Sequence, residues 1–308
     1  MTAAGRSSEI FAAGALDGLS VLVTGGGTGL GRESAFELAR GGALVTITGR
    51  REDVLAEAAG QLQGAPGEIG WIAGDVREPE DARRLVGEVL ARNGRLDVLV
   101  NNAGGQFFSP AELIVAKGWR AVWRLNVEGI LNMAEAAHEL AFTAAGGGRV
   151  INVTLSPHHG MPGMAHSGAA RATVEALTAE LAARWAGEGV TVTAVAAGHF
   201  ATEVTAKYPE SVRAGASRTV PIQRLGKPIE HAWLVAMLCS RLGRAFNGST
   251  VTLDGGRDNW FGPWPPPGLA DEAGEVPVEE RRVAMAEGDG SVEERKGGKE
   301  LGGGRGLE

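Results

Sequence analysis

Tyrosine and cysteine are almost missing from this sequence of 308 residues, which holds one of each, Tyr208 and Cys239. A single cysteine excludes a disulfide framework within the chain and fits a reducing compartment. Cys239 stands in an apolar helical run, which favours a small core residue over a nucleophile. The single tyrosine leaves one phenol in the chain that could act as an acid, and it follows the sixth expected strand.

Long apolar runs and an excess of basic charge are also absent. No run approaches the roughly 18 apolar residues that a membrane span needs, and residues 1–14 lack a signal-peptide pattern. A formal net charge of −7 argues against nucleic acid as a main partner, because binding a phosphate backbone needs a basic surface. We therefore expect a cytoplasmic protein without a membrane or nucleic-acid partner. No histidine spacing matches a familiar metal site, so we expect no metal.

Glycine is abundant instead, with 48 residues, and it dominates the stretch Thr24–Gly31, TGGGTGLG. An apolar run at 19–23 precedes this stretch and a helical pattern at 32–39 follows it. A strand, a glycine turn and a helix start bring the backbone and free N–H groups close to a pyrophosphate. The sequence therefore predicts a dinucleotide site. Its expected contacts here are Thr24, Gly25, Thr28, Gly29, Leu30 and Gly31.

Strand-like apolar runs alternate with helical patterns through most of the chain. The expected strands are 19–23, 44–48, 69–73, 96–100, 150–153, 190–196 and 249–253. The expected helices are 32–39, 53–62, 79–91, 115–138, 171–185 and 229–242. This alternation predicts an α/β fold, a Rossmann-type doubly wound parallel sheet of about seven strands. We expect an N-terminal arm at 1–15, one catalytic domain at 16–262, and a Pro-rich arm with a disordered charged tail at 263–308.

Ligands of such sheets bind beyond the carboxyl ends of the strands. After the second strand, Gly49 stands where an acidic residue would hold the ribose of NAD, and Arg50 and Arg51 follow it. Two arginines suit a 2′-phosphate, so we expect NADP(H) rather than NAD(H). Asp75, followed by Val76, can accept from the adenine amino group; the alternative is an N-cap of the next helix. The expected contacts after the fourth strand are Asn102, Ala103 and Gly104.

These segments, together with Asn126 and with Gly198 and Thr202 after the sixth strand, resemble the short-chain dehydrogenase/reductase family from about residue 16 to residue 256. The resemblance implies an NAD(P)(H)-binding domain and a homotetramer or homodimer. By the same resemblance, Asn126 would support a water of a proton relay. Gly198 and Thr202 would lie at the nicotinamide.

The resemblance breaks where most of the family has a serine on the fifth strand and a Tyr-x-x-x-Lys pattern on the next helix. Here Ser167 takes the tyrosine position, Arg171 takes the lysine position, and Leu155 falls at or next to the serine. Arg171 lies one turn from Ser167 on the same helix face and can still hydrogen-bond a ribose. An aliphatic hydroxyl is too weak an acid to replace tyrosine near neutral pH. The candidate acids or oxyanion donors are Ser167, Thr154, Ser156, His166 and Tyr208, followed by His158, His159 and His199.

Residues 101–112, 117–119 and 166–172 resemble peroxisomal trans-2-enoyl-CoA reductases, and residues 157–160 resemble bacterial citronellol/citronellal dehydrogenases. A basic segment after His199, which suits the phosphates of CoA, carries Lys207, Arg213, Arg218 and Arg224. Three functions stay open: an NADP(H)-dependent reductase of an enoyl thioester, an alcohol/aldehyde dehydrogenase with a non-standard proton donor, and a dinucleotide-binding protein without turnover. The partner would be a small-molecule or acyl-CoA substrate. The expected substrate contacts are Gln106, Phe107, Ser156, His158, His166 and His199.

Overall fold

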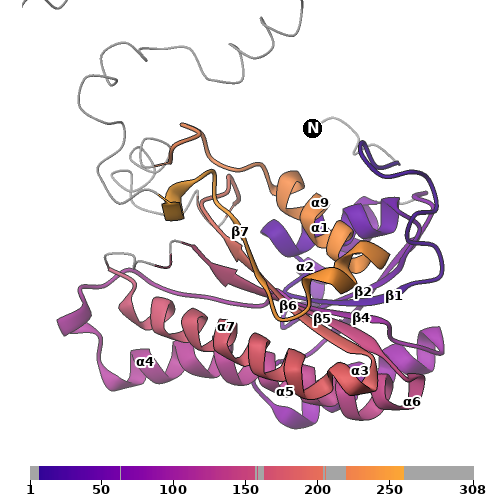
Figure 1. Ribbon diagram of the computed structural model, residues 1–308, viewed down its shortest axis with the longest axis horizontal. Helices are drawn as coiled ribbons and strands as arrows, with labels where there is room; N and C mark the ends of the chain where they lie inside the picture. The colour runs from indigo at the N-terminus through magenta and orange to yellow at the C-terminus, as the bar shows by residue number, and fades with distance from the viewer. Residues whose placement is uncertain are drawn as a thin grey trace, which may run out of the picture. The chain divides into compact units, whose positions relative to one another are not determined.

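The computed structural model describes residues 7–62, 64–156, 158, 163–203, 205 and 220–259. Its centre is a seven-stranded sheet in the order β3-β2-β1-β4-β5-β6-β7, and every pair of neighbours is parallel. This arrangement, which Figure 1 shows, confirms the predicted doubly wound sheet. The strands are β1 (Ser20–Thr24), β2 (Leu44–Gly49), β3 (Glu68–Ala73), β4 (Val98–Asn101), β5 (Gly148–Leu155), β6 (Val190–Ala197) and β7 (Thr250–Leu253).

The strand β1 marks the point where the order of the sheet reverses, because it pairs with β2 on one side and β4 on the other. Val21 and Val23 pack into one hydrophobic cluster, and Leu22 between them packs into the other. The strand is buried on both faces, and so its sequence is a continuous apolar run rather than an alternating one. A crevice at the carboxyl end of such a reversal is the usual ligand site of an open α/β sheet.

Two layers of helices cover the sheet (Figure 1). The helices α1 (Gly29–Arg40), α2 (Glu52–Gln61) and α9 (Pro228–Cys239) supply Leu38, Leu55 and Leu238 to one core. The helices α3 (Pro79–Asn93), α5 (Gly129–Ala137) and α7 (Ala165–Trp185) supply Leu85, Met133 and Trp185 to the other. Cys239 is buried in the first core, and burial raises the pKa of its thiol to about 12.

The helical pattern at 115–138 forms a longer and less regular unit than the sequence predicts. It contains α4 (Ala116–Trp123), a π turn η2 (Arg124–Glu128), α5, a second π turn η3 (His138–Phe142) and α6 (Thr143–Ala145). Within η2 the amide nitrogen of Asn126 donates to the carbonyl oxygen of Val122 at 2.8 Å. A π turn re-aims one side chain without ending the helix, and hydrophobic periodicity carries no signal for it.

Two other helix boundaries differ from the prediction. The helix α7 begins at Ala165, six residues before the predicted start at Arg171, and so Ser167 lies in its first turn. The glycine at 168 weakened the helical pattern there, whereas packing of the helix overrides that preference. The helix α9 ends at Cys239, and Ser240 then accepts a hydrogen bond from the backbone N–H of Leu242 to open the 3₁₀ turn η7 (Arg241–Phe246).

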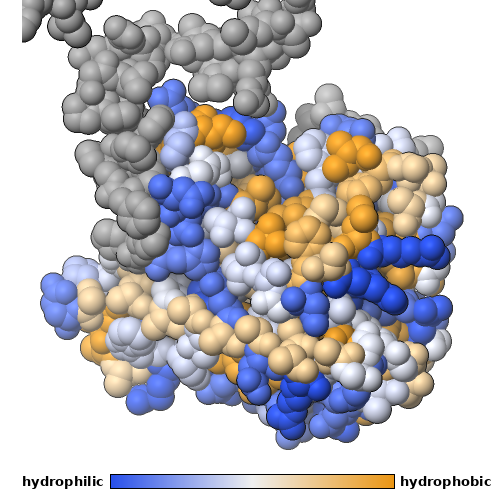
Figure 2. All heavy atoms as spheres, viewed as in Figure 1, coloured by the Kyte–Doolittle hydropathy of each residue, from blue (hydrophilic) through white to orange (hydrophobic). Residues whose placement is uncertain are grey.

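The segment before β1 packs against the domain. The Ser8 hydroxyl donates to Glu37 on α1, and Phe11 packs against the core beneath that helix. In the view of Figure 2, apolar side chains gather on the surface around α9. Within the described ranges, no helix combines the length and apolar character needed to cross a bilayer. The predicted arm and tail at 263–308 lie outside the described residues.

Candidate functional site

Two cavities lie at the carboxyl edge of the sheet and share a wall formed by Gly25, Thr28, Ala103 and Gly104. The first, of about 570 Å³, runs along the ends of β2 and β3, and we call it the adenosine-side cavity. The second, of about 270 Å³, reaches the ends of β5 and β6 and the start of α7, and we call it the reaction-side cavity. Because they share a wall, they make up one elongated crevice at the reversal of the strand order.

The glycine turn packs too closely against the segment after β4 to admit side chains at Gly25 and Gly31. A Cβ on Gly25 would lie 2.9 Å from the Ala103 Cα, and one on Gly31 would lie 2.3 Å from the Asn102 Nδ2. Gly25 and Gly29 have φ of 66° and 54°, a conformation that favours glycine. Thr28 is the N-cap residue of α1, but its side chain makes no capping hydrogen bond. The backbone N–H groups at this helix start can therefore bind an anion.

Thr24 and Asn102 tie the ends of β1 and β4 together. The Thr24 hydroxyl accepts from the backbone N–H groups of Asn102 at 3.0 Å and Ala103 at 2.9 Å. The Asn102 amide nitrogen donates to the Thr24 carbonyl at 3.0 Å and the Gly25 carbonyl at 3.3 Å. Thr24 is only 1% exposed, and so its part is to position the crevice wall.

A carboxylate already lies at the start of α1. Glu203 pairs with Arg32 and accepts from the backbone N–H of Gly29. Burial acts to raise the pKa of Glu203, but hydrogen bonds from its own backbone, from Arg32 and from Gly29 outweigh it and lower the pKa. The helix start therefore stabilises negative charge at the place where the sequence predicts a pyrophosphate.

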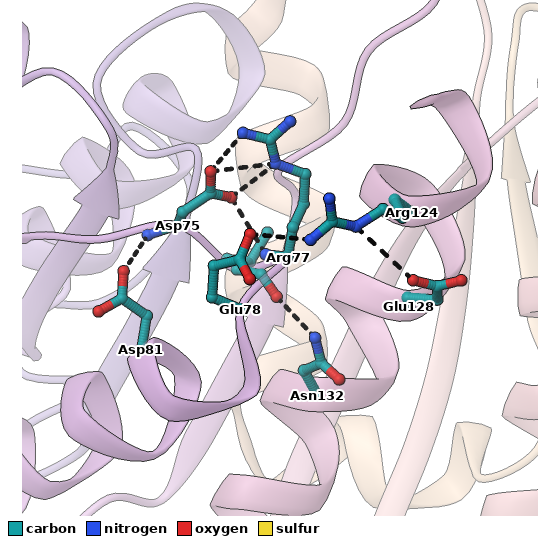
Figure 3. Close-up of polar contacts among 8 residues, drawn as sticks. Asp75, Arg77, Glu78, Asp81, Arg124, Glu128 and Asn132 are labelled. Carbon is teal, nitrogen blue, oxygen red and sulfur yellow. Dashed lines mark hydrogen bonds and ion pairs between the residues drawn. The ribbon is translucent and has the colours of Figure 1, made fainter. Parts of the chain in front are cut away.

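Arg50, Arg51, Asp75 and Val76 all line the adenosine-side cavity. Figure 3 shows the Asp75 carboxylate against the side chain of Arg77, whose Nε lies 2.9 and 3.0 Å from its two oxygens. The Arg77 hydrogen bond is the main cause of the lowered pKa of Asp75, and the charge of Arg50 adds to it. The alternative of Asp75 as an N-cap is wrong, because Glu78 holds that position before α3.

The segment that carries Asp75 is fixed from two sides. Its backbone N–H donates to Asp81 at 2.9 Å, and the Val76 carbonyl accepts from Asn132 on α5 at 3.0 Å (Figure 3). Arg124 in η2 pairs with Glu78 at 2.8 Å. The helical layer on this side therefore sets the position of the adenosine-side wall.

Arg171 is buried against the reaction-side cavity. Its Nη1 donates to the Val153 carbonyl at 2.8 Å, and its Nη2 would lie 2.2 Å from a Cβ on Gly104. Burial lowers the pKa of Arg171 to about 10, and so the side chain stays charged near neutral pH. Its Nε has no hydrogen-bond partner among the described residues. The charged guanidinium of Arg171 at the cavity wall fits a ribose hydroxyl, and the glycine turn at the start of α1 fits a pyrophosphate.

Ser167 and His166 lie apart from the cavity lining that Arg171 joins. They are 1% exposed or less, and in the described part of the chain the Ser167 hydroxyl has no hydrogen-bond partner. The His166 ring packs against Phe107 and Trp119, with centroid distances of 4.3 and 6.0 Å. Burial lowers the pKa of His166.

The other predicted residues divide between the cavity wall and its supports. Leu30, Gln106, Thr154, Gly198, His199 and Thr202 line the reaction-side cavity. Burial and then the charge of Arg257 lower the pKa of His199, against the opposing charge of Asp254. Ser156 is buried and donates to Asp254. Asn126 is buried too, and its amide exchanges hydrogen bonds with the backbone of Gly105 at 2.8 and 3.1 Å.

His158 belongs to a cluster of charged side chains that the sequence does not predict. Its ring lies between Glu175 on α7 and Asp258 in the 3₁₀ turn η8 (Arg257–Asn259), and Thr154 donates to the same Glu175. The only sequence signal is the position of Glu175 one helical turn after Arg171. Tyr208, His159 and the basic residues at 207, 213 and 218 lie outside the described residues.

The chain matches known proteins over most of its length. A family model described as enoyl-(acyl carrier protein) reductase matches residues 25–258. A probable 2,4-dienoyl-CoA reductase of Bacillus subtilis is 35% identical over 251 residues, which cover 80% of this chain and 98% of that protein. A 3-oxoacyl-(acyl carrier protein) reductase FabG of Thermotoga maritima is 30% identical over 241 residues, which cover 78% and 98%.

Among solved structures, the citronellol catabolism dehydrogenase AtuB of Pseudomonas aeruginosa matches with a TM-score of 0.73 at 37% identity. The match covers 82% of this chain and 100% of that one. The matched range holds the glycine turn, the strand ends and α7, and the relatives are named as oxidoreductases. The chain is therefore an oxidoreductase that belongs to the short-chain dehydrogenase/reductase family.

Proposed function

We propose that this protein is an NADP(H)-dependent reductase of an activated C=C bond, such as that of a trans-2-enoyl-CoA. The observation that carries the proposal is the contrast along the crevice. The glycine turn and Arg171 suit the cofactor, whereas the tyrosine position is filled by a buried serine that has no hydrogen-bond partner among the described residues. Relatives named as 2,4-dienoyl-CoA reductases, at 32–35% identity, support the same substrate class.

The chemistry of an enoyl thioester suits this site. Reducing a ketone produces an alkoxide that needs a strong proton donor, whereas hydride addition to a conjugated thioester produces an enolate that needs an oxyanion site. Bound NADPH would supply the hydride. Gln106, Thr154 and His199 line the cavity with polar side chains that can hydrogen-bond the thioester oxygen. Arg171 would orient the nicotinamide ribose, and the apolar wall formed by Phe108 and Met164 would limit access of water.

The cofactor preference follows from the adenosine-side cavity. Arg50 and Arg51 line it together with Asp75, and the charge of Arg50 reaches the Asp75 carboxylate. Two guanidinium groups can bind a 2′-phosphate through charge-assisted hydrogen bonds, and NAD(H) offers no such group. We therefore assign NADP(H) as the cofactor.

The proposed assembly is a homotetramer or homodimer in the cytoplasm. Large apolar side chains remain exposed on and beside α4, where Val115 is 68% and Trp123 is 38% exposed. A second copy of the chain would cover these side chains. Light scattering coupled to size-exclusion chromatography measures the mass directly, and a monomer at micromolar concentration would contradict this assignment.

The test is NADPH oxidation with trans-2-enoyl-CoA and 2,4-dienoyl-CoA substrates of several chain lengths. We expect turnover with at least one chain length and a higher KM for NADH than for NADPH. Absence of turnover with every thioester, together with oxidation of alcohols or reduction of aldehydes, would overturn the proposal.

The similarity to AtuB favours a second candidate, an alcohol/aldehyde dehydrogenase acting on a terpenoid. That reaction needs a proton donor other than the family's usual tyrosine. NADP⁺ reduction with citronellol separates this candidate from the first. Tight NADPH binding without turnover in either assay would instead indicate a dinucleotide-binding protein.

A further inference from the structure

A continuous row of polar side chains connects the reaction-side cavity to the surface. Thr154, near the end of β5, lines the cavity, and its hydroxyl donates to Glu175 Oε1 at 2.7 Å. The Nε2 of His158 lies 3.0 Å from the same oxygen. Exposure rises along the row, from 3% for Thr154 to 17% for the Glu175 side chain and 30% for that of His158. The row therefore runs from a buried cavity wall to solvent.

The ring of His158 is held by carboxylates on both sides. Nε2 contacts Glu175, Nδ1 contacts Asp258, and the His158 backbone N–H donates to Asp258 at 2.6 Å. Ionised carboxylates only accept hydrogen bonds, so both ring nitrogens must donate to satisfy them, and only the imidazolium has two N–H donors. This geometry favours the protonated His158 ring, whose Nε2 proton lies next to Glu175.

Asp258 is itself fixed in place. Its backbone N–H donates to Asp254 at 2.7 Å, and Asp254 also accepts from the Gly256 N–H at 2.9 Å and from Ser156. The row therefore rests on three separate elements: β5, α7 and the turn after β7. Such anchoring keeps donor–acceptor distances short enough for proton transfer.

We propose that Thr154, Glu175 and His158 form a proton relay that delivers a solvent proton to the substrate in the reaction-side cavity, in place of the family's tyrosine. The proposal rests on the proposed reductase function for its substrate. Thr154 is the group that contacts the substrate, and Glu175 and His158 act through it.

The relay supplies the proton that the reduction of the C=C bond consumes. Bound NADPH would supply a hydride with its electron pair to the β-carbon of the C=C bond and would leave as NADP⁺, and the thioester would become an enolate. The His158 Nε2 proton first passes to the Glu175 carboxylate, and the Thr154 hydroxyl then accepts from the Glu175 carboxyl group and turns its own O–H toward the substrate. The Thr154 O–H bond breaks as a C–H bond forms at the α-carbon of the enolate, the Glu175 proton replaces the proton that Thr154 has lost, and water reprotonates His158. The net consumption is one hydride and one solvent proton.

The charge around His158 sets the pH dependence. Burial acts to lower its pKa, but the hydrogen bond to Asp258 and the charges of Glu175 and Asp258 outweigh burial and raise the pKa. Glu175 faces the ring from α7, and Asp258 faces it from η8. Because the relay needs protonated His158, kcat for reduction should fall as pH rises through this raised pKa. Without the Glu175 charge the pKa of His158 should be lower, and kcat should then fall at a lower pH.

The test compares Glu175→Gln and Thr154→Val with Glu180→Gln, which removes an exposed carboxylate from the same helix. General acid catalysis contributes at least about 100-fold, so we expect kcat to fall by roughly 100-fold in the first two variants. We expect kcat to be unchanged in Glu180→Gln, and the NADPH dissociation constant, measured by fluorescence, to change less than about 2-fold in all three. Thr154→Ser should restore most of the rate because it retains the hydroxyl.

Two further readouts separate a relay from a purely structural cluster. Groups acting in series are not additive, so Thr154→Val combined with Glu175→Gln should be no slower than either single variant. NMR titration of His158 should give a lower pKa in Glu175→Gln than in the wild type. Additive losses, a wild-type rate in Glu175→Gln, or loss of proton transfer only in Tyr208→Phe would overturn the relay.

The outcomes also separate the relay from the proposed function. If the wild type reduces aldehydes but no enoyl thioester, the proposed function fails, and the variants are then measured with the aldehyde. If the wild type reduces thioesters and Glu175→Gln does so equally well, only the relay fails. If neither substrate class turns over, both fail.

Discussion

The two ends of the crevice are built in different ways. The cofactor end is formed mainly by backbone and glycines from contiguous motifs, as in the Gly25 turn and at Gly104. The reaction end is formed by side chains from distant segments, such as Thr154, Arg171 and His199. Phosphates and ribose have fixed shapes that backbone groups can match, whereas a reaction depends on the acidity and position of individual side chains. The first end therefore depends on local motifs, and the second depends on how separate segments pack.

The largest expected effect comes from closing the cofactor end. Gly31→Val places a side chain against the Asn102 amide and the Gly25 carbonyl, which lie 2.3 and 2.5 Å from the new Cβ. Overpacking costs up to about 3 kcal/mol of folding stability. Relief of the clash would displace the Gly25 turn, which lines both cavities, and so we expect NADPH affinity to fall about 100-fold. Isothermal titration calorimetry measures it. Gly87→Ala on α3, with no atom within 4 Å of the new Cβ, is the matched control and should bind normally.

A smaller effect is expected where the two ends meet. Arg171→Met removes the donor to the Val153 carbonyl and the charged group at the cavity wall. Hydrogen bonds to charged groups contribute about 2 kcal/mol, so kcat/KM should fall about 30-fold. Steady-state kinetics checks this. An unchanged kcat/KM would mean that Arg171 has only a structural role and does not bind the cofactor.

The adenosine side should affect the choice of cofactor alone. We expect Arg50→Ala combined with Arg51→Ala to raise the KM for NADPH about 10-fold and leave that for NADH within about 2-fold, because only NADPH carries the 2′-phosphate. Parallel kinetics with both cofactors provides the measurement. Equal losses for both would show that the arginines shape the cavity instead of reading the phosphate.

The smallest effect is expected at the tyrosine position. The Ser167 hydroxyl is buried and has no partner among the described residues, so Ser167→Ala removes no hydrogen bond seen there. We expect kcat to change less than about 2-fold and thermal stability to stay equal or rise slightly. Differential scanning fluorimetry and kinetics test both. A large loss of kcat would show that the Ser167 hydroxyl takes part in the reaction, and this prediction would then be wrong.

The sequence predicted those parts of the molecule whose physical requirements are local. Strands buried on both faces must be apolar throughout, as at Val21–Val23, and so a central strand such as β1 was predictable. The turn at Thr24–Gly31 requires glycine at fixed spacing. The π turn at Asn126 and the early start of α7 were not predictable, because side-chain contacts distant in sequence decide them.

The candidate site divides in the same way. Gly25, Asp75 and Arg171 stand in motifs with known spacing, and the structure places them at the crevice. Glu175 and Asp258 are ordinary acidic residues in the sequence, and only folding brings both of them to His158. A single sequence shows no pattern that predicts these contacts, because they depend on how β5, α7 and the turn after β7 pack together.

Glu203 lies where it should affect the rate at which the cofactor leaves the glycine turn. Its carboxylate pairs with Arg32 and contacts the Gly29 N–H, so one anion already lies at the helix start where we expect a pyrophosphate to bind. We therefore expect cofactor binding to displace the Glu203 carboxylate, and we expect its return to favour departure of the spent cofactor. In many enzymes product release limits turnover. Stopped-flow measurement of NADP⁺ release should therefore show a slower rate in Glu203→Gln, and an equal or faster rate would refute the exchange.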